Sequence, residues 1–349
     1  MTLSLAVSNR MQSTSGSGSG SGDDSSDLEH HSIDTSTAIY FCFVGVIGTI
    51  ANLIVIFRGF RYKSGQTNST GSHRSAAMDS TNLFIISLAI SNLGTSTFSV
   101  GIFIFPMYVP NTPINDFTCR FIWPVRELFT AVACYSFTCI AVGRYLILFR
   151  SFRNTKVFSS PIANNVALWL FSYLLFALPF AAAYKPVKLD GTNQMICDTM
   201  YETAEAQRAY VTFLIVCNSF VPAFLVCVSY LGIIRRLKRS RNVVAPISTL
   251  KALPDNREIL SIAVHSHRAA RISLLLLVSF IITFVPYGVL TLLIEYNKWS
   301  SETFPQLQVI HAVTFCLLHS GAVMDPLIVM LSSSTYRPDC SIFKRYFSR

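Results

Sequence analysis

Seven stretches of this chain contain no Asp, Glu, Lys or Arg, and each is near or above the length that crosses a lipid bilayer. They are Ala38–Phe57, Leu83–Val109, Leu128–Gly143 (extending outward to Cys119), Val157–Tyr184, Ala209–Ile234, Ile272–Ile294 and Phe304–Met324. Inside a bilayer the backbone must satisfy its own hydrogen bonds, as a helix does. Only 13% of the residues are charged, well below the ~25% of a soluble domain. The sequence predicts an all-α membrane protein with a seven-transmembrane bundle over residues 37–331.

The positive charges predict how the bundle is oriented. The loops after the first, third, fifth and seventh stretches hold 4, 4, 9 and 4 Lys or Arg, which is 21 of the 28 in the chain. Such loops stay in the cytoplasm, so we expect the N-terminus outside and the C-terminus inside the cell. This placement explains the net charge of +10 without nucleic acid as a partner. We see no cleaved signal peptide before the first stretch.

The two ends of the chain are predicted to lie outside the bundle. Residues 1–36 are rich in Ser and Gly and then acidic, so we expect a disordered extracellular tail. In residues 332–349, Tyr336, Cys340, Phe343 and Phe347 are spaced to form one apolar helical face. We expect a short amphipathic eighth helix on the cytoplasmic side of the membrane, attracted to membrane lipid. Cys340 on that face is a candidate for palmitoylation, with a free thiol as the alternative.

The cysteines predict one disulfide. Of the nine, six lie inside apolar stretches, where a free Cys usually acts as a small apolar residue. Only Cys119 and Cys197 lie in segments outside the membrane on the outer side. Disulfides persist in oxidising compartments, so we expect these two to be paired.

Each apolar stretch carries a short motif. These are, in order, Asn52; Leu88-Ala89-Ile90-Ser91-Asn92; Gly143-Arg144-Tyr145; Trp169 and Pro179; Pro222 and Tyr230; Phe284-Val285-Pro286; and Asp325-Pro326. This order resembles the rhodopsin-like G protein-coupled receptors over about residues 37–347. The resemblance implies a plasma-membrane receptor that signals to heterotrimeric G proteins. It also implies a set of transduction residues: Asn52, Asn92, Arg144, Tyr145, Pro222, Tyr230, Pro286, Asp325 and Pro326.

Two departures from the family pattern lead to hypotheses. Gly143 stands where the family usually has an acid, so the ion pair that holds Arg144 in the resting state is missing, and we expect raised basal activity. Asn92 and Asp325 exchange the family's usual Asp and Asn. A buried acid needs a partner, so we expect these two side chains close in space, with a cation or waters between them. We expect no other cofactor and no metal site.

The resemblance places the ligand pocket in the outer half of the bundle, under the loop that holds Cys197. Its candidate residues are Arg126, Glu127, Thr130, Phe284, Tyr287, Phe315 and His319. Arg126 stands where amine receptors have Asp, and His319 where opsins have the retinal-binding Lys, so a simple amine and retinal are both disfavoured.

Two of these candidates have structural alternatives. Arg126 suits a ligand carboxylate, phosphate or acidic peptide side chain. Its alternative is an internal pair with Glu295 or Glu127, of which Glu127 is the weaker partner because helix neighbours point about 100° apart. For His319 we favour a hydrogen-bonded bundle histidine over a ligand contact.

The sequence therefore favours a G protein-coupled receptor for an extracellular peptide or a small acidic or organic ligand. One alternative is an opsin-like orphan receptor without retinal. The other is a small-solute or proton-linked transporter, in which Asp325 and His319 relay protons. The apolar stretches contain no nucleophile elbow, metal-binding spacing or phosphate loop, so we expect no enzyme.

Overall fold

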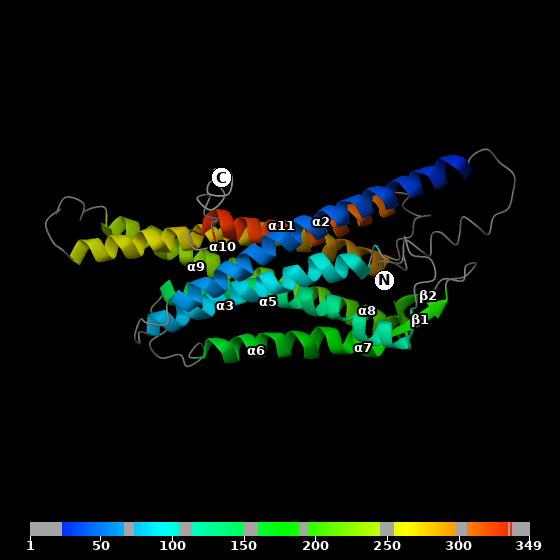
Figure 1. The fold of residues 1–349 in the computed structure, drawn as a ribbon, viewed down its shortest axis with the longest axis horizontal. Coiled ribbons are helices and arrows are strands. Elements are labelled where there is room, and N and C mark those ends of the chain that lie inside the picture. Colours follow the sequence, from blue (N-terminus) through cyan, green and yellow to red (C-terminus); the bar gives the residue numbers. More distant parts are fainter. Residues whose placement is uncertain are drawn as a thin grey trace, which may run out of the picture.

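The computed structural model describes residues 23–65, 73–102, 104, 114–148, 160–188, 195–244, 255–297, 306–333 and 336. Within these ranges, seven helical spans are long and apolar enough to cross a membrane. The spans lie side by side along the long axis of the molecule (Figure 1). The predicted all-α bundle of seven helices is confirmed.

Several spans combine α-helix with a short π-helical turn. The first span lies in α2 (Asp23–Gly65), and the second joins α3 (His73–Gly94) to the turn η1 (Thr95–Ser99). The third joins η2 (Thr118–Ile122) to α5 (Val125–Leu148). The fourth joins α6 (Pro161–Ser172), η5 (Tyr173–Ala177) and α7 (Leu178–Ala183), and the fifth joins α8 (Ala204–Ile215), η6 (Val216–Phe220) and α9 (Val221–Val244). The sixth and seventh are α10 (Asp255–Asn297) and α11 (Leu307–Ser332).

One helix end differs from the sequence prediction. The backbone is helical from Asp23, so residues 23–36 differ from the disordered tail expected there. A membrane-spanning helix has already passed the costly nucleation step, so it can propagate outward through polar residues. Helix α6 of the fourth span begins at Pro161, because Ser160 caps it by accepting a hydrogen bond from the Ala163 amide over 3.4 Å. The predicted start, Val157, lies outside the described residues.

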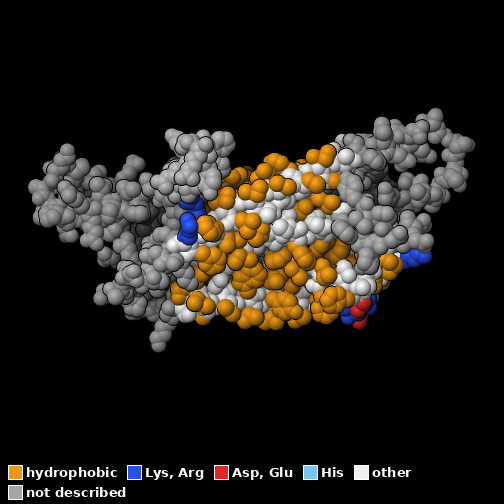
Figure 2. Space-filling view, viewed as in Figure 1, with side chains coloured by type: hydrophobic (Ala, Val, Ile, Leu, Met, Phe, Trp, Pro, Cys, Tyr) orange, Lys and Arg blue, Asp and Glu red, His pale blue; other side chains and the backbone are white. Residues whose placement is uncertain are grey.

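The third span is the centre of the bundle. Helix α5 contacts α3, α6, α9 and α10, and the side chains of Ala131, Val132 and Cys134 have no exposed surface. The largest apolar cluster gathers around it and includes Phe84, Phe137, Ile140 and Phe280. A space-filling view shows the opposite character on the outside, where apolar side chains form a band and charged ones lie at its ends (Figure 2). This is the pattern of a protein whose solvent is lipid.

A two-stranded antiparallel hairpin lies at one end of the bundle (Figure 1). Strand β1 (Tyr184–Lys188) pairs with β2 (Met195–Thr199), with Pro186 opposite Cys197. Cys197 forms the predicted disulfide with Cys119 in η2, and their Cα atoms are 5.3 Å apart. The hairpin is therefore covalently fixed to the start of the third span.

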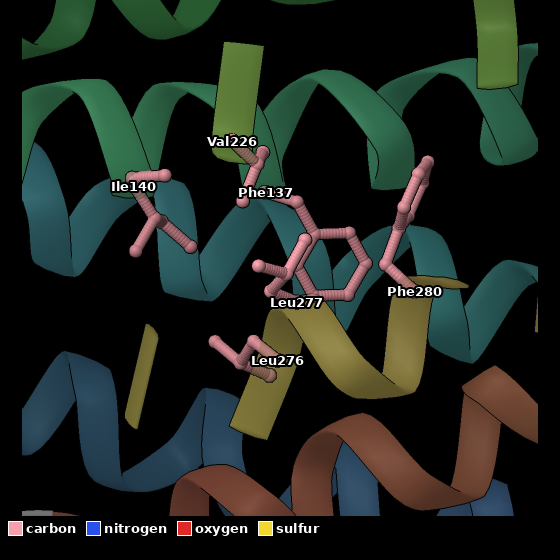
Figure 3. A pocket seen from close by; sticks show the side chains of 7 residues that line it. Phe137, Ile140, Val226, Leu276, Leu277 and Phe280 are labelled. Carbon is pink, nitrogen blue, oxygen red and sulfur yellow. The ribbon is translucent and has the colours of Figure 1, made fainter. Parts of the chain in front are cut away.

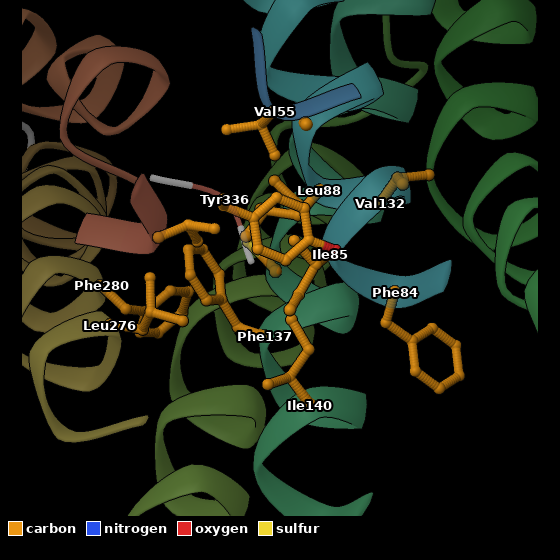
Figure 4. Packing of buried hydrophobic residues seen from close by; sticks show 14 of the residues in the cluster. Val55, Phe84, Ile85, Leu88, Val132, Phe137, Ile140, Leu276, Phe280 and Tyr336 are labelled. Atoms are coloured by element: carbon orange, nitrogen blue, oxygen red, sulfur yellow. The ribbon is translucent and has the colours of Figure 1, made fainter. Parts of the chain in front are cut away.

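The predicted eighth helix stays a prediction, because residues 337–349, including Cys340, lie outside the described residues. Tyr336 is described, and only 1% of it is exposed. It belongs to the largest apolar cluster, against Leu88 and Ile85 (Figure 4). The chain after α11 therefore returns to the core at Tyr336.

Candidate functional site

An ion pair lies in the bundle beneath the hairpin. The Arg126 guanidinium donates hydrogen bonds from Nε and Nη2 to Oε1 of Glu127, over 2.9 and 2.5 Å. The side chains are 15% and 17% exposed. The expectation that Glu127 is the weaker partner of Arg126 is wrong. Backbone geometry separates neighbouring Cβ directions, but both side chains are long enough to fold toward one another.

The Arg126–Glu127 pair is bounded on one side by tyrosines. Arg126 Nη2 also donates to the Tyr184 hydroxyl over 3.4 Å. An aromatic cluster continues from Tyr184 through Phe180 to Tyr210, with ring centroids 5.4 and 5.3 Å apart. Tyr201, which follows β2, contacts Tyr210 at 5.7 Å. The cluster thus joins the fourth span, the hairpin and the fifth span around one charged pair.

Three carboxylates act on the hydroxyl of Tyr201. Burial raises the pKa of the Tyr201 hydroxyl, and the charges of Glu127, Asp198 and Glu295 raise it further. Glu295 Oε2 accepts a hydrogen bond from Gln207 Nε2 over 3.4 Å, which links α10 to α8. Carboxylates from three separate segments of the chain therefore act on the same hydroxyl, that of Tyr201.

A second aromatic cluster lies on the sixth, seventh and first spans. The Phe315 ring contacts Tyr287 at 5.9 Å, His311 at 6.1 Å and Phe41 at 5.6 Å. His319 is 4% exposed, and its Nδ1 lies 3.0 Å from the Phe315 carbonyl oxygen. This geometry fits the hydrogen-bonded bundle histidine favoured from the sequence.

The other two pocket candidates lie apart from this cluster. Phe284 stacks on Phe280 at 4.8 Å in the largest apolar cluster, and Thr130 bonds the Arg126 carbonyl over 3.0 Å. Of the three aromatic residues expected to line one floor, Tyr287 and Phe315 are together, and Phe284 packs with Phe280.

A polar centre lies deeper in the bundle, at Asp325. Its Oδ2 accepts a hydrogen bond from Asn92 Nδ2 over 3.0 Å, and its Oδ1 accepts one from Ser279 over 3.1 Å. The predicted closeness of Asn92 and Asp325 is present, as a direct hydrogen bond between the two side chains. The reason is that an amide can supply the donor a buried carboxylate needs. Asn52 donates to the carbonyls of Gly48 and Ala322, both over 2.8 Å, and so joins α2 to α11.

The remaining transduction candidates lie on the helices where the sequence places them. Pro222 is buried at the start of α9, and Pro286 and Pro326 lie inside α10 and α11. Tyr230 packs beside the cluster of Ala141, Val226 and Leu277. A Cβ added at Gly232 would collide with the Tyr145 ring, so Gly232 makes room for it.

A small cavity lies between α5, α9 and α10 and contains no ligand site. Its volume is about 10 Å³, and its lining is apolar, including Phe137, Val226 and Leu277 (Figure 3). A space of about this size holds at most one water, and an apolar one stays dry. Among the residues that the structure describes, no group of His, Cys, Asp and Glu could hold a metal ion.

Several site residues were not among the sequence candidates. Tyr184, Tyr201 and Tyr210 surround the ion pair, and Ser279 completes the contacts of Asp325. Tyr184 begins β1 opposite Thr199, the last residue of β2, and Tyr201 follows β2, so their proximity follows from the strand pairing around Cys197. Predicting this proximity from the sequence would require the register of the two strands, which the sequence motifs do not give.

The family of the chain follows from comparison with known proteins. The family described as "7 transmembrane receptor (rhodopsin family)" matches residues 51–328. The chain therefore belongs to the rhodopsin family of seven-transmembrane receptors, as its motifs indicated, and it is a multi-pass membrane protein. This family consists of receptors, not enzymes.

Individual relatives are distant but cover most of the chain. Human galanin receptor type 1 is 22% identical over 303 residues, which is 86% of this chain and 79% of the relative. Human melanopsin is 24% identical over 318 residues, 90% of this chain and 62% of the relative. Neuropeptide receptor npr-1 of Caenorhabditis elegans is 21% identical over 345 residues, with 88% and 71% covered.

Proposed function

We propose that the chain is a plasma-membrane receptor that binds an extracellular peptide or small organic ligand and activates heterotrimeric G proteins. Its N-terminus lies outside the cell, as the Lys and Arg distribution predicts. The observation that supports the ligand site is the Arg126–Glu127 pair between two aromatic clusters, under a disulfide-fixed hairpin. A concave site with a few converging polar groups is the usual form of a ligand pocket.

A peptide is favoured over a lipid or an amine. Arg126 offers a guanidinium for an acidic group, and Tyr184 and Tyr287 offer hydroxyls and ring faces. Among the relatives, one is named as a neuropeptide receptor. The anchors in this proposal are Arg126 with Glu127, and the aromatic walls are Tyr287 and Phe315, with Thr130, His319 and Phe284 below.

Signalling would occur at the opposite end of the bundle. Agonist binding favours a state in which the sixth helix moves outward and exposes Arg144, Tyr145 and the basic end of α9 to the G protein. The polar centre of Asn52, Asn92 and Asp325 lies between the two ends and connects the first, second, sixth and seventh spans. A ligand that binds both states equally would produce no signal.

An opsin-like receptor without retinal is the second candidate, because melanopsin is among the relatives. His319 occupies the position of the opsin Lys and cannot form a Schiff base. Purified protein mixed with 11-cis-retinal should therefore show no red-shifted absorbance band. A stable red-shifted band would show that retinal binds covalently and would contradict this candidate.

A cation beside Asp325 is a separate part of the proposal. Carboxylate and hydroxyl oxygens suit a hard cation, provided that Asn92 turns its amide oxygen inward. The purified protein should then melt at a higher temperature in sodium chloride than in choline chloride at equal ionic strength. Equal melting temperatures in the two salts would contradict the proposal that a cation binds beside Asp325.

The receptor proposal is tested by G protein activation in cells that express the protein. Tissue extracts are applied with and without protease treatment, and untransfected cells serve as the control. A response that protease removes supports a peptide ligand, whereas one that survives supports a small organic or lipid ligand. Solute uptake without nucleotide exchange on any G protein would favour a transporter instead.

A further inference from the structure

The ion pair of Arg126 and Glu127 restricts what kind of ligand can open it. Two of the three guanidinium nitrogens, Nε and Nη2, donate to a single carboxylate oxygen, Oε1 of Glu127, over 2.9 and 2.5 Å. Each side chain is less than one-fifth exposed, at 15% and 17%. The pair is electrically neutral, and each charge is satisfied mainly by the other. An anionic ligand that takes the Nε and Nη2 donors of Arg126 must therefore displace Glu127.

Displacing Glu127 leaves a carboxylate in a site from which water is largely excluded. Removing one partner of a buried ion pair is strongly unfavourable, because the remaining charge has lost its compensation. The surroundings add to this effect. The charge of Glu127 acts on the hydroxyls of Tyr184 and Tyr287, and the carboxylates of Asp198 and Glu295 act together with it on Tyr201. A ligand with only an acidic group would thus add a negative charge near these carboxylates and leave Glu127 without its partner.

A cationic group on the same ligand removes this difficulty. It would pair with Glu127 while the acidic group pairs with Arg126, so both charges keep a partner. The tyrosines then provide hydroxyls and ring faces for the aromatic or aliphatic part of the ligand, and ring faces favour a nearby cation. The hydroxyl of Tyr210 is buried without a hydrogen-bond partner among the described residues, which leaves one further group for the ligand to satisfy.

We propose that the ligand carries an anionic and a cationic group close together and binds by opening the Arg126–Glu127 pair and satisfying both halves. A peptide with neighbouring acidic and basic side chains has this chemistry, as does one with an acidic side chain near a free amino terminus. This inference rests on the proposed function, since it concerns the ligand of the same site. The expected ligand is then not a simple acid but a molecule that carries both a negative and a positive group.

The test uses the full-length protein in lipid nanodiscs and four pools of random pentapeptides with blocked ends. Every peptide holds one aromatic residue, and the pools add Glu and Lys, Glu alone, Lys alone, or neither. Binding is measured as a rise in melting temperature across a concentration series. The pool with both charges should reach half-maximal stabilisation at a concentration about 10- to 100-fold below that of the Glu pool.

Variants test whether the preference for the doubly charged pool arises from the Arg126–Glu127 pair. In Glu127→Gln no carboxylate is left uncompensated, so the Glu pool should improve to match the doubly charged pool. In Arg126→Gln the Lys pool should improve instead, which keeps the test valid if one variant fails to fold. Asp116→Asn is the matched control, because it breaks an ion pair on the surface, in which Arg120 is 41% and Asp116 61% exposed. It should leave the order of the four pools unchanged.

Three results would overturn the inference. The Glu pool could match the doubly charged pool on the unmodified protein, Glu127→Gln and Arg126→Gln could both leave the order unchanged, or no pool could bind. None of them bears on whether tissue extract activates a G protein through this chain. The failure of the ligand class and the failure of the receptor function are therefore separate results.

Discussion

The side-chain amide of Asn92 donates a hydrogen bond to the carboxylate of Asp325 over 3.0 Å and so joins the second helix to the seventh. Both residues are almost fully buried, at 4% and 3% exposed. The contact does not depend on which helix carries the acid, because one amide and one carboxylate suffice. The exchange of these residues relative to the family pattern therefore keeps the interaction.

Reversing the pair should be tolerated only as a double change. Asn92→Asp alone places two carboxylates in contact, and two such groups cannot both stay charged without a large cost. We expect a loss of about 3–5 kcal/mol in stability, and recovery of most of it when Asp325→Asn is added. Melting temperatures of purified protein measure this. Losses that simply add would show that the two residues act separately.

Removing the amide of Asn52 should loosen the first helix from the seventh. Asn52→Leu keeps the volume but leaves the Ala322 carbonyl without this donor, which we expect to cost about 1–3 kcal/mol. Thr97→Val is the control, because its hydroxyl is exposed and bonds only within its own helix. Equal melting temperatures for the two variants would contradict the role of Asn52.

Restoring an acid beside Arg144 should lower ligand-independent signalling. Gly143 has room for a side chain, since among the described residues outside its own helix an added Cβ would meet only Thr81 Oγ1, at 3.8 Å. An ion pair worth about 1 kcal/mol in Gly143→Asp would reduce the signalling population about fivefold. Basal G protein activation at matched surface expression measures this, with uncharged Gly143→Asn as the control. The hypothesis is wrong if Asp and Asn act alike.

Adding one methyl group at Gly232 should destabilise the end of the bundle near Arg144. Gly232→Ala forces the Tyr145 ring to move, and overpacking of this kind costs about 1–3 kcal/mol. Gly101→Ala provides a matched control, because among the described residues no atom beyond its own helix lies within 4 Å of its added Cβ. In a helix that change should be neutral or stabilising. Melting temperatures of the two purified variants measure this. The prediction is wrong if Gly232→Ala melts at the same temperature as Gly101→Ala or above it.

The seven-helix architecture could be predicted because it follows from long stretches that contain no charged residue. A stretch without Asp, Glu, Lys or Arg has one stable form in a bilayer, so the seven spans and the Cys119–Cys197 disulfide follow from residue types alone. The contact of Asn92 with Asp325 could also be expected, since a buried acid needs a partner.

The details of the site depend on side-chain reach and on turns, which residue types do not determine. Helix geometry argues against pairing Arg126 with Glu127, yet their side chains fold together. Tyr201 and Tyr184 meet the site only because the hairpin register brings them there. The collision that excludes a side chain at Gly232 requires the packing of α9 on α5, which no local pattern indicates.

The neutral pair beneath the hairpin also has an evolutionary consequence. Loss of either Arg126 or Glu127 alone leaves one buried charge without compensation, whereas replacement of both by uncharged residues of similar size is nearly neutral. Selection therefore acts on the two positions as one unit. Descendants of a common ancestor should keep both charges or lose both together, and a lineage that retains only one should recognise a different ligand.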